Sequence, residues 1–266
     1  MTILLDNGHG GLVNGQYQTN GKRSPIWNDG SQLYEGEFNR AIVGGIVQEL
    51  TRLHISYVNI APEYRDVRLE TRVKRANEYS GITSFYLSIH ANAGGGHGAE
   101  IFTSPGDTKS DQIATIFGNE YKRIFPKRKL RTDFSDGDLD KERRFYVLTK
   151  TKMPAILTEN FFMDNEEECR NILMNRAGRD KIVQYHMNAI LRVREKFFWQ
   201  PLRYQMKREA ISLIVLCLSL TFLSCVEEVE INDSLQSEIN IENVLIVEAT
   251  ITDEFINQEV LLSRGS

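Results

Sequence analysis

The chain has 266 residues, of which 41% are hydrophobic and 26% charged, a composition typical of globular proteins. This length accommodates one large domain, or a domain of about 200 residues with an appendage. The formal net charge of −4 argues against nucleic acid as a partner, because phosphate binders usually present a basic face. The three cysteines (Cys169, Cys217 and Cys225) are too few for a disulfide framework and lack the spacing of an all-cysteine zinc site. Any metal would have to be held by histidines and carboxylates.

Predicted strands and helices alternate along the first two hundred residues. The chain opens on a buried apolar strand, which a glycine-rich turn ends. A long polar loop then extends to about Tyr34. Short apolar runs predict strands at 2–6, 55–60, 85–89, 99–103 and 155–159. Apolar residues at helical spacing predict helices at 35–53, 67–79, 111–124, 165–174 and 180–198. The alternation predicts a single α/β domain with a largely parallel central sheet flanked by helices.

Reactive side chains follow three of these strands. His9 comes just after the first strand, His90 ends the third, and Glu159 ends a late one. Each has another interpretation by itself: a turn cap for His9, a core histidine for His90 and a surface charge for Glu159. Because ligands of parallel sheets bind beyond the carboxyl ends of the strands, we expect the three side chains to meet there.

Two histidines and a carboxylate match the needs of a zinc hydrolase. Such enzymes hold the metal with three N or O ligands and leave a fourth position open for water. The metal lowers the pKa of that water and polarises the scissile carbonyl, while a nearby carboxylate moves the proton to the leaving amine.

Four ordered motifs resemble the zinc-dependent N-acetylmuramoyl-L-alanine amidase family of the amidase-3 type. They are LDNGHGG at 5–11, EGEFNRA at 35–41, SIHANA at 88–93 and PAILTENFF at 154–162. The segments 72–77 and 98–100 fit between them in order and spacing, so the resemblance covers about residues 2–195. The family often has Pro where this chain has Asn7 and Gly where it has Asn160. Both asparagines still allow tight turns.

The resemblance implies one Zn²⁺ per catalytic domain, with His9, Glu35 and His90 as its ligands and Glu159 as the general base. It implies that the substrate is peptidoglycan, cut at the amide between N-acetylmuramic acid and L-alanine. Glu37 is the competing carboxylate, but side chains two residues apart on a helix diverge by roughly 200°, so both cannot readily face one metal. Family spacing favours Glu35, and Glu37 is left to solvent or to the helix dipole.

Three further residues are candidate substrate contacts: Asn92, His97 and Arg131. Asn92 belongs to the second histidine motif, and His97 lies in a glycine loop where a solvated position is the alternative. Arg131 belongs to the charged segment 127–144, which forms either a solvated face or a rim that grips the carboxylates of the stem peptide.

Two rival functions remain at this point. A peptidoglycan-binding module of the same fold without turnover would lack a ligand or the base, and all four positions are filled. A zinc peptidase acting on the stem peptide often carries His-Glu-x-x-His on one helix, and this sequence has no such segment.

The sequence changes character near residue 200, and we expect a catalytic domain at 1–200 with an appended tail at 201–266. Residues 206–225 resemble a lipoprotein signal, with a basic start, an apolar run and a small residue before Cys225. The tail resembles the start of an unrelated surface lipoprotein, so we favour a fused tail without a part in catalysis. The run 211–226 could instead contact a membrane as an anchor, or pack as a core helix.

The N-terminus carries no secretory signal pattern. We therefore expect an export route like that of a prophage lysin, for an enzyme that acts on the cell wall, in the periplasm or cell envelope. We also expect a monomer.

Overall fold

A computed structural model describes residues 1–198, 245–249 and 260–264 of the chain. The chain divides into two units, Met1–Pro201 and Leu202–Ser266. In the second unit, β9 (Leu245–Ala249) pairs antiparallel with β10 (Val260–Arg264). The apolar run 211–226 and the signal-like segment 206–225 lie outside the described residues.

Within the described part of the chain, no helix combines the length and the apolar character that crossing a bilayer requires.

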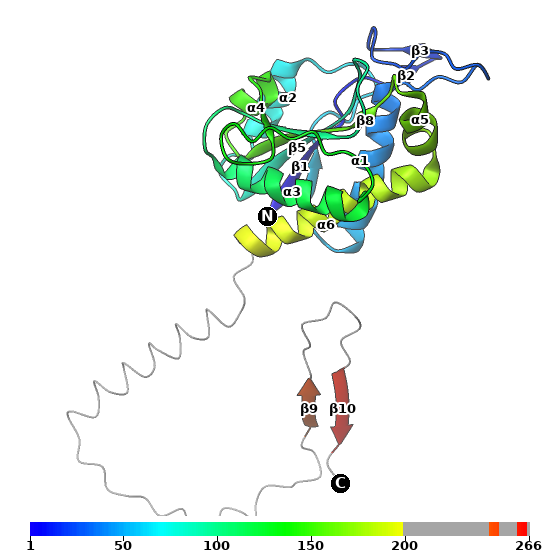
Figure 1. Cartoon of the computed structure of the whole chain (residues 1–266). Helices are drawn as coiled ribbons and strands as arrows, with labels where there is room; N and C mark the ends of the chain where they lie inside the picture. Colours follow the sequence, from blue (N-terminus) through cyan, green and yellow to red (C-terminus); the bar gives the residue numbers. More distant parts are fainter. Residues whose placement is uncertain (199–244, 250–259, 265–266) are drawn as a thin grey trace, which may run out of the picture. The chain divides into compact units, whose positions relative to one another are not determined.

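A six-stranded sheet in the order β4-β1-β5-β8-β6-β7 forms the centre of the first unit (Figure 1). Its strands are β1 (Thr2–Asp6), β4 (Tyr57–Asn59), β5 (Ser84–Asn92), β6 (Glu100–Thr103), β7 (Lys141–Glu142) and β8 (Ala155–Phe162). Neighbouring strands run parallel except β6 and β8, which are antiparallel. The predicted α/β fold with a largely parallel sheet is confirmed.

The helices follow the predicted order with differences at their ends. Their bounds are α1 Glu35–Arg52, α2 Leu69–Asn77, α3 Lys109–Ile124, α4 Tyr146–Lys150, α5 Glu166–Glu168 and α6 Arg176–Phe198. The helix expected at 165–174 is a single turn, α5, that continues as a π-helical segment, Cys169–Leu173. The sequence prediction missed the short α4, the strand β7 inside the charged segment, and a hairpin of β2 (Leu12–Val13) and β3 (Gln16–Tyr17). Elements of two to five residues are too short to show a period.

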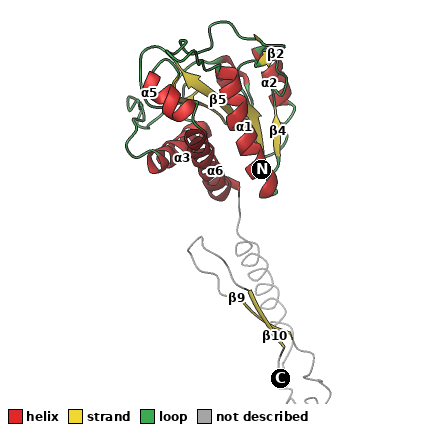
Figure 2. Cartoon of the chain, turned by 90° about the vertical axis from the view of Figure 1, so that its right-hand side faces the viewer, coloured by secondary structure: helices red, strands yellow, loops and turns green. Residues whose placement is uncertain are grey.

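Strand side chains alternate between two cores, which makes the unit a three-layer sandwich (Figure 2). Ile3 and Leu5 of β1 join the core formed with α1, α3 and α6. Leu4 joins the second core, to which α2 and α4 contribute. Tyr86 of β5 and Leu157 of β8 also belong to this second core. Because side chains two residues apart on a strand share a face, Glu159 lies on the same face of the sheet as Leu157.

Helix α1 is placed by a continuous apolar stripe. Phe38, Ile42, Ile46 and Leu50 recur at spacings of four and are fully buried against the sheet. Carboxylates in the first turn favour the positive end of the helix dipole. The stripe therefore sets the rotation of α1 and holds its first residue, Glu35, at the carboxyl edge of the sheet.

His186 of α6 is a core residue. The sequence places it in mid-helix among polar neighbours, whereas the structure buries it completely. Its Nδ1 lies 2.8 Å from the carbonyl oxygen of Ile182 and must donate, so Nε2 accepts from the Thr158 hydroxyl at 3.0 Å. Burial lowers the pKa of His186 to about 3, so the ring is neutral and structural.

Candidate active site

Four elements bring His9, Glu35, His90 and Glu159 to one edge of the sheet. His9 lies in the loop after β1, Glu35 begins α1, and His90 and Glu159 are register partners on β5 and β8. Glu35 Oε1 lies 2.9 Å from His90 Nδ1 and 3.4 Å from His9 Nε2. The two imidazole rings lie edge to face, with 4.9 Å between their centroids. The structure therefore brings together the four residues that the motifs singled out.

Two glycines allow this close approach. Gly8 has a φ of +69°, and a Cβ there would lie 2.6 Å from Cε1 of His90. A Cβ on Gly36 would lie 1.9 Å from the carbonyl oxygen of Gly10. Helix α1 thus begins in backbone contact with the loop that carries His9, which only glycine permits.

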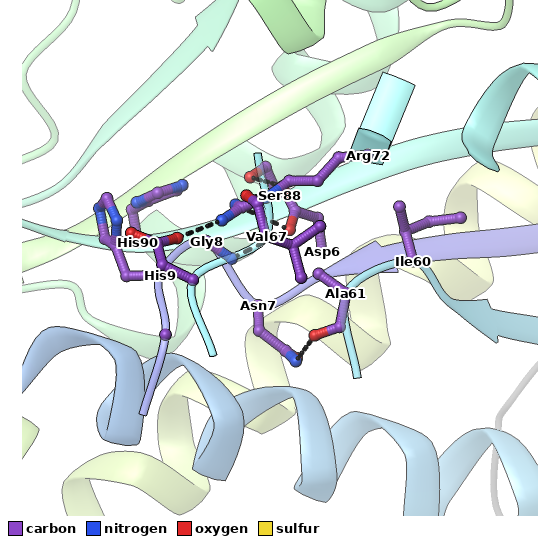
Figure 3. A network of polar contacts seen from close by, with 12 residues as sticks. Asp6, Asn7, Gly8, His9, Ile60, Ala61, Val67, Arg72, Ser88 and His90 are labelled. Atoms are coloured by element: carbon purple, nitrogen blue, oxygen red, sulfur yellow. Dashed lines mark hydrogen bonds and ion pairs between the residues drawn. The ribbon is translucent and has the colours of Figure 1, made fainter. Parts of the chain in front are cut away.

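A buried carboxylate, Asp6, orders the floor of the site (Figure 3). Tyr86 donates to Asp6 Oδ2 at 2.6 Å, Ser88 donates to the same oxygen at 2.9 Å, and Arg72 Nη1 donates to Oδ1 at 3.2 Å. Asp6 and Arg72 are both almost fully buried. Because Asp6 Oδ1 also accepts the Gly8 amide at 3.1 Å, this network fixes the turn that aims His9.

A bulge in β8 directly follows Glu159. His90 pairs with Glu159 while Asn92 pairs with Phe162, so β8 carries one extra residue here. Phe161 takes up the irregularity with a φ of +63°, and packing of its buried ring against Phe125 at 5.0 Å compensates this strained conformation.

Asn160 ties the bulge to the neighbouring strand. Its Nδ2 donates to the carbonyl oxygen of His90 at 2.9 Å, and its Oδ1 accepts from the Tyr185 hydroxyl. Asn160 therefore links the strands of the general-base candidate and a ligand candidate.

A cavity of about 610 Å³ opens over this edge. His9, His90 and Glu159 line it together with the Asp6–Arg72 pair. Its other walls come from the loop before α2, the start of α4 and the polar loop after β1; they include Thr19, Lys22, Asp66, Val67, Arg68, Phe145 and Tyr146. The site is thus a concave polar floor with an aromatic rim, the setting expected of a ligand site.

Burial and neighbouring groups set the charges of Glu35 and Glu159. Burial raises the pKa of Glu35, but hydrogen bonds with His9 and His90 outweigh it and leave that pKa below its usual value. Part of Glu159 faces the cavity, while its Oε2 is fully covered and has no hydrogen-bond partner. Burial and then the Glu35 carboxylate raise the pKa of Glu159 well above its usual value, because two nearby carboxylates disfavour a second charge.

The donor set fits a zinc ion. One nitrogen of each histidine and one carboxylate oxygen of Glu35 lie within 4.8 Å of one another. Ligands of a tetrahedral zinc at about 2.0–2.1 Å lie roughly 3.4 Å apart. Glu35 Oε2 is buried without a hydrogen-bond partner, as a ligand atom awaiting a cation would be. Two imidazoles and one carboxylate are the donors of a catalytic zinc site, and the open cavity leaves room for water at the fourth position.

Glu37 has a structural contact of its own. The sequence leaves it to solvent or to the helix dipole, whereas its Oε1 accepts the Leu12 amide at 2.7 Å and the residue is half-buried. It holds the β2 hairpin against α1.

The three candidate substrate contacts lie outside the 610 Å³ cavity. Asn92 donates to Glu100 at 2.6 Å and accepts the Ala93 amide at 2.8 Å. Arg131 bonds the same Glu100 at 2.7 Å and lies over the Phe162 ring. His97 is exposed beside a separate cavity of about 310 Å³.

Sequence reasoning missed three residues of the cavity wall. Lys22 comes from the polar loop, where its charge lowers the pKa of both Glu159 and His9, and Tyr146 belongs to the unpredicted α4. Arg72 carried a usable signal, because it shares the inward face of α2 with Val73 and Ala76. A charged residue on the apolar face of a helix indicates a buried partner.

Comparisons with known proteins identify relatives of this chain. The N-acetylmuramoyl-L-alanine amidase CwlM of Bacillus licheniformis is 35% identical over 127 residues, which cover 47% of this chain and 46% of that protein. The endolysin of Bacillus phage SPP1 is 27% identical over 201 residues, which cover 72% of this chain and 65% of that protein. The chain therefore spans about half to two thirds of the length of these relatives.

The fold has solved counterparts. The N-acetylmuramoyl-L-alanine amidase from Clostridium difficile 630 superposes with a TM-score of 0.59 at 23% identity, over 74% of this chain and 97% of that one. A family model described as N-acetylmuramoyl-L-alanine amidase, of the amidase-3 type, matches residues 3–192, which include all four motifs. The chain belongs to the N-acetylmuramoyl-L-alanine amidase family.

Proposed function

We propose that the first unit of this chain is a zinc-dependent hydrolase that cuts the amide bond between N-acetylmuramic acid and L-alanine in peptidoglycan. The observation that carries the proposal is the meeting of His9, Glu35 and His90 around one point, with Glu159 lining the same cavity as the two histidines. Family membership supplies the substrate class.

Each residue has a role that follows from its position. His9, Glu35 and His90 hold the zinc, which when bound supplies Lewis acidity toward the scissile carbonyl and toward water. Glu159 accepts the proton of the attacking water and passes it to the nitrogen of the leaving L-alanine. Lys22 and the histidines offset the negative charge that the two glutamates bring together. The Asp6–Arg72 pair keeps the His9 loop in position.

Product analysis tests the proposal against its rivals. Purified peptidoglycan is digested with the zinc-loaded full chain, and the fragments are analysed by mass spectrometry together with the metal content of the protein. An amidase frees stem peptides that begin with L-alanine and leaves intact glycan strands. New amino groups elsewhere in the stem peptide would establish a peptidase instead. Binding without any released fragment would establish a module without turnover.

Glu159→Gln separates a base from a structural charge. The amide keeps the shape of the side chain but cannot accept the proton, so turnover should fall by about 10²–10⁴-fold. Zinc content and the circular dichroism spectrum should remain those of wild type. Glu49→Gln, which removes an exposed carboxylate of α1, is the matched control and should keep full activity. Activity of Glu159→Gln within about threefold of wild type contradicts the assignment.

The cell wall is the proposed place of action, because peptidoglycan is the substrate of this family and a phage endolysin is among the relatives. We propose that the first unit works as a monomer, since one chain supplies all four residues of the site.

A further inference from the structure

A second group of carboxylates lies at the other end of the sheet. Asp111 in the first turn of α3 and Asp138 and Asp140 in the loop before β7 place carboxylate oxygens within 4.8 Å of one another. Asp111 and Asp138 line a cavity of about 480 Å³ with Asp107, Asp136 and Glu142. Between 136 and 142, acidic residues stand at every second position.

Two of these carboxylates are buried and incompletely bonded. Asp140 is only 2% exposed; its Oδ2 accepts the Thr103 hydroxyl at 2.5 Å, while its Oδ1 has no hydrogen-bond partner. Asp111 is 6% exposed; its Oδ2 accepts the Thr108 amide in the cap of α3, and its Oδ1 also has no partner. Buried polar atoms without partners are rare in folded proteins, because each one loses its bonds to water without a replacement. Asp111 is itself one of the residues that line a cavity with further carboxylates.

This group is separate from the proposed active site. Strand β6 runs antiparallel to β8, with Glu100 opposite Glu159 and Phe102 opposite Leu157. The end of β6 at Thr103 therefore lies toward the amino end of β8, at the edge of the sheet opposite the site. The two cavities share no lining residue.

We propose that Asp111, Asp138 and Asp140 bind a calcium ion that fastens the loop before β7 to the start of α3. Three carboxylates supply hard oxygen ligands and a charge that a divalent cation neutralises. Asp136 and Glu142, on the same cavity wall, lie close enough in sequence to add oxygens as the ion binds. Calcium accepts six to eight oxygens in irregular arrangements, whereas magnesium demands octahedral geometry and keeps most of its waters. Three carboxylates, with two more on the cavity wall, offer more protein oxygens than magnesium usually takes, and therefore favour calcium.

The protonation of the cluster supports the same proposal. Burial, then contact with Asp138, raises the pKa of Asp140, and burial also raises that of Asp111. The titratable groups that face Asp140 are Asp138 on its own loop and Asp111 on α3. Neighbouring carboxylates that resist ionisation are the setting in which a cation replaces protons.

Calcium titration of the zinc-loaded full chain tests the proposal by isothermal calorimetry in metal-free buffer. Saturated zinc keeps the first site out of the measurement. Wild type should bind one calcium per chain with a Kd below about 1 mM, and magnesium at least tenfold more weakly. Asp138→Asn should weaken calcium binding by at least tenfold. Asp133→Asn removes an exposed carboxylate of the same loop outside the cavity and should change the Kd less than twofold.

Thermal unfolding gives a second measurement that does not depend on calorimetric heats. Calcium should raise the Tm of wild type progressively with concentration, since the ion binds only the folded chain. The same additions should leave the Tm of Asp138→Asn unchanged. The proposal is overturned by a wild type that shows no saturable calcium binding, by equal loss in Asp133→Asn, or by magnesium binding as tightly as calcium. Loss of peptidoglycan hydrolysis bears on the proposed function alone, because no residue of this cluster lines the first cavity.

Discussion

At the start of α1, Glu35 belongs to the proposed metal site, whereas Glu37 has a structural role. Glu35 meets His9 and His90 across the sheet edge, whereas Glu37 holds the Leu12 amide. The two side chains leave the helix in nearly opposite directions, so each can serve only one of these partners.

We expect Glu35→Gln and Glu37→Gln to differ in metal content. Glu35→Gln removes an anionic ligand and should abolish stoichiometric zinc, measured by atomic emission on the dialysed protein. Glu37→Gln keeps an oxygen that can accept from Leu12 and should retain nearly all of the zinc. Equal loss of zinc in the two variants would show that Glu37 is the ligand, and full retention in both would remove the carboxylate from the proposed set.

Asp140 gives the folded protein a pH dependence of its own. Burial and the neighbouring Asp138 raise the pKa of Asp140 to about 8, far above that of the same group in the unfolded chain. Between about pH 4 and 8 the folded state therefore keeps a proton that the unfolded state has released, and stability falls as the pH rises through this window.

The variant Asp140→Asn should flatten that dependence in calcium-free buffer. A repulsion worth about 1 kcal/mol shifts the Tm of a domain of this size by roughly 2–4 °C. Thermal scans followed by circular dichroism measure the effect. We expect the Tm of the variant to exceed that of wild type by at least this amount at pH 8, and the two Tm values to be equal at pH 4. An identical decline of Tm with pH in both proteins would contradict the assignment to Asp140.

Between elements, backbone contact sets the geometry of the site. The first turn of α1 touches the His9 loop so closely that a Cβ at Gly36 would meet the carbonyl oxygen of Gly10. Gly44 lies on the same helix, and a Cβ there would meet no atom within 4 Å.

These two glycines form a matched pair for mutation to alanine. Gly36→Ala should force α1 and the loop apart, lower the Tm and weaken zinc binding, because the helix carries Glu35 and the loop carries His9. Gly44→Ala adds a methyl group to an open position and should stabilise the helix by about 0.5–1 kcal/mol. Thermal scans and zinc titrations measure both effects. Unchanged zinc affinity in Gly36→Ala would mean that the site adapts to the displacement.

At the scale of the whole molecule, the proposed chemistry lies within the first unit. The family match ends at residue 192, and α6 ends at Phe198. The proposed site residues lie between His9 and Glu159. A chain of about 200 residues already buries roughly 70% of its surface on folding.

We propose that the chain truncated after Pro201 remains an intact enzyme. Its turnover on solubilised peptidoglycan should equal that of the full chain, and its solubility should be higher, because it lacks the apolar run 211–226. Sedimentation and product release measure the two properties. If the truncated chain unfolds while the full chain works, residues 202–266 belong to the catalytic domain.

The sequence by itself determined the long elements and the four motif residues of this protein. A helix buried on one face shows apolar residues at spacings of four, as from Phe38 to Leu50. A strand buried on both faces shows a continuous apolar run, as in Thr2–Asp6. Both patterns are local and can be seen in the sequence. The convergence of His9, His90 and Glu159 followed from the rule that parallel strands end at one edge.

Only the tertiary structure decided the features that depend on contacts between distant residues. The Asp6–Arg72 pair joins positions 66 residues apart, and the Phe161 bulge exists because β8 must pair with β5 on both sides of it. Asp111 and Asp140, each with an unpaired oxygen, come together across 29 positions of sequence, and the segment of Asp140 resembles an ordinary charged surface loop. Burial and partner choice are set by the packing of the whole chain, and no local period records them.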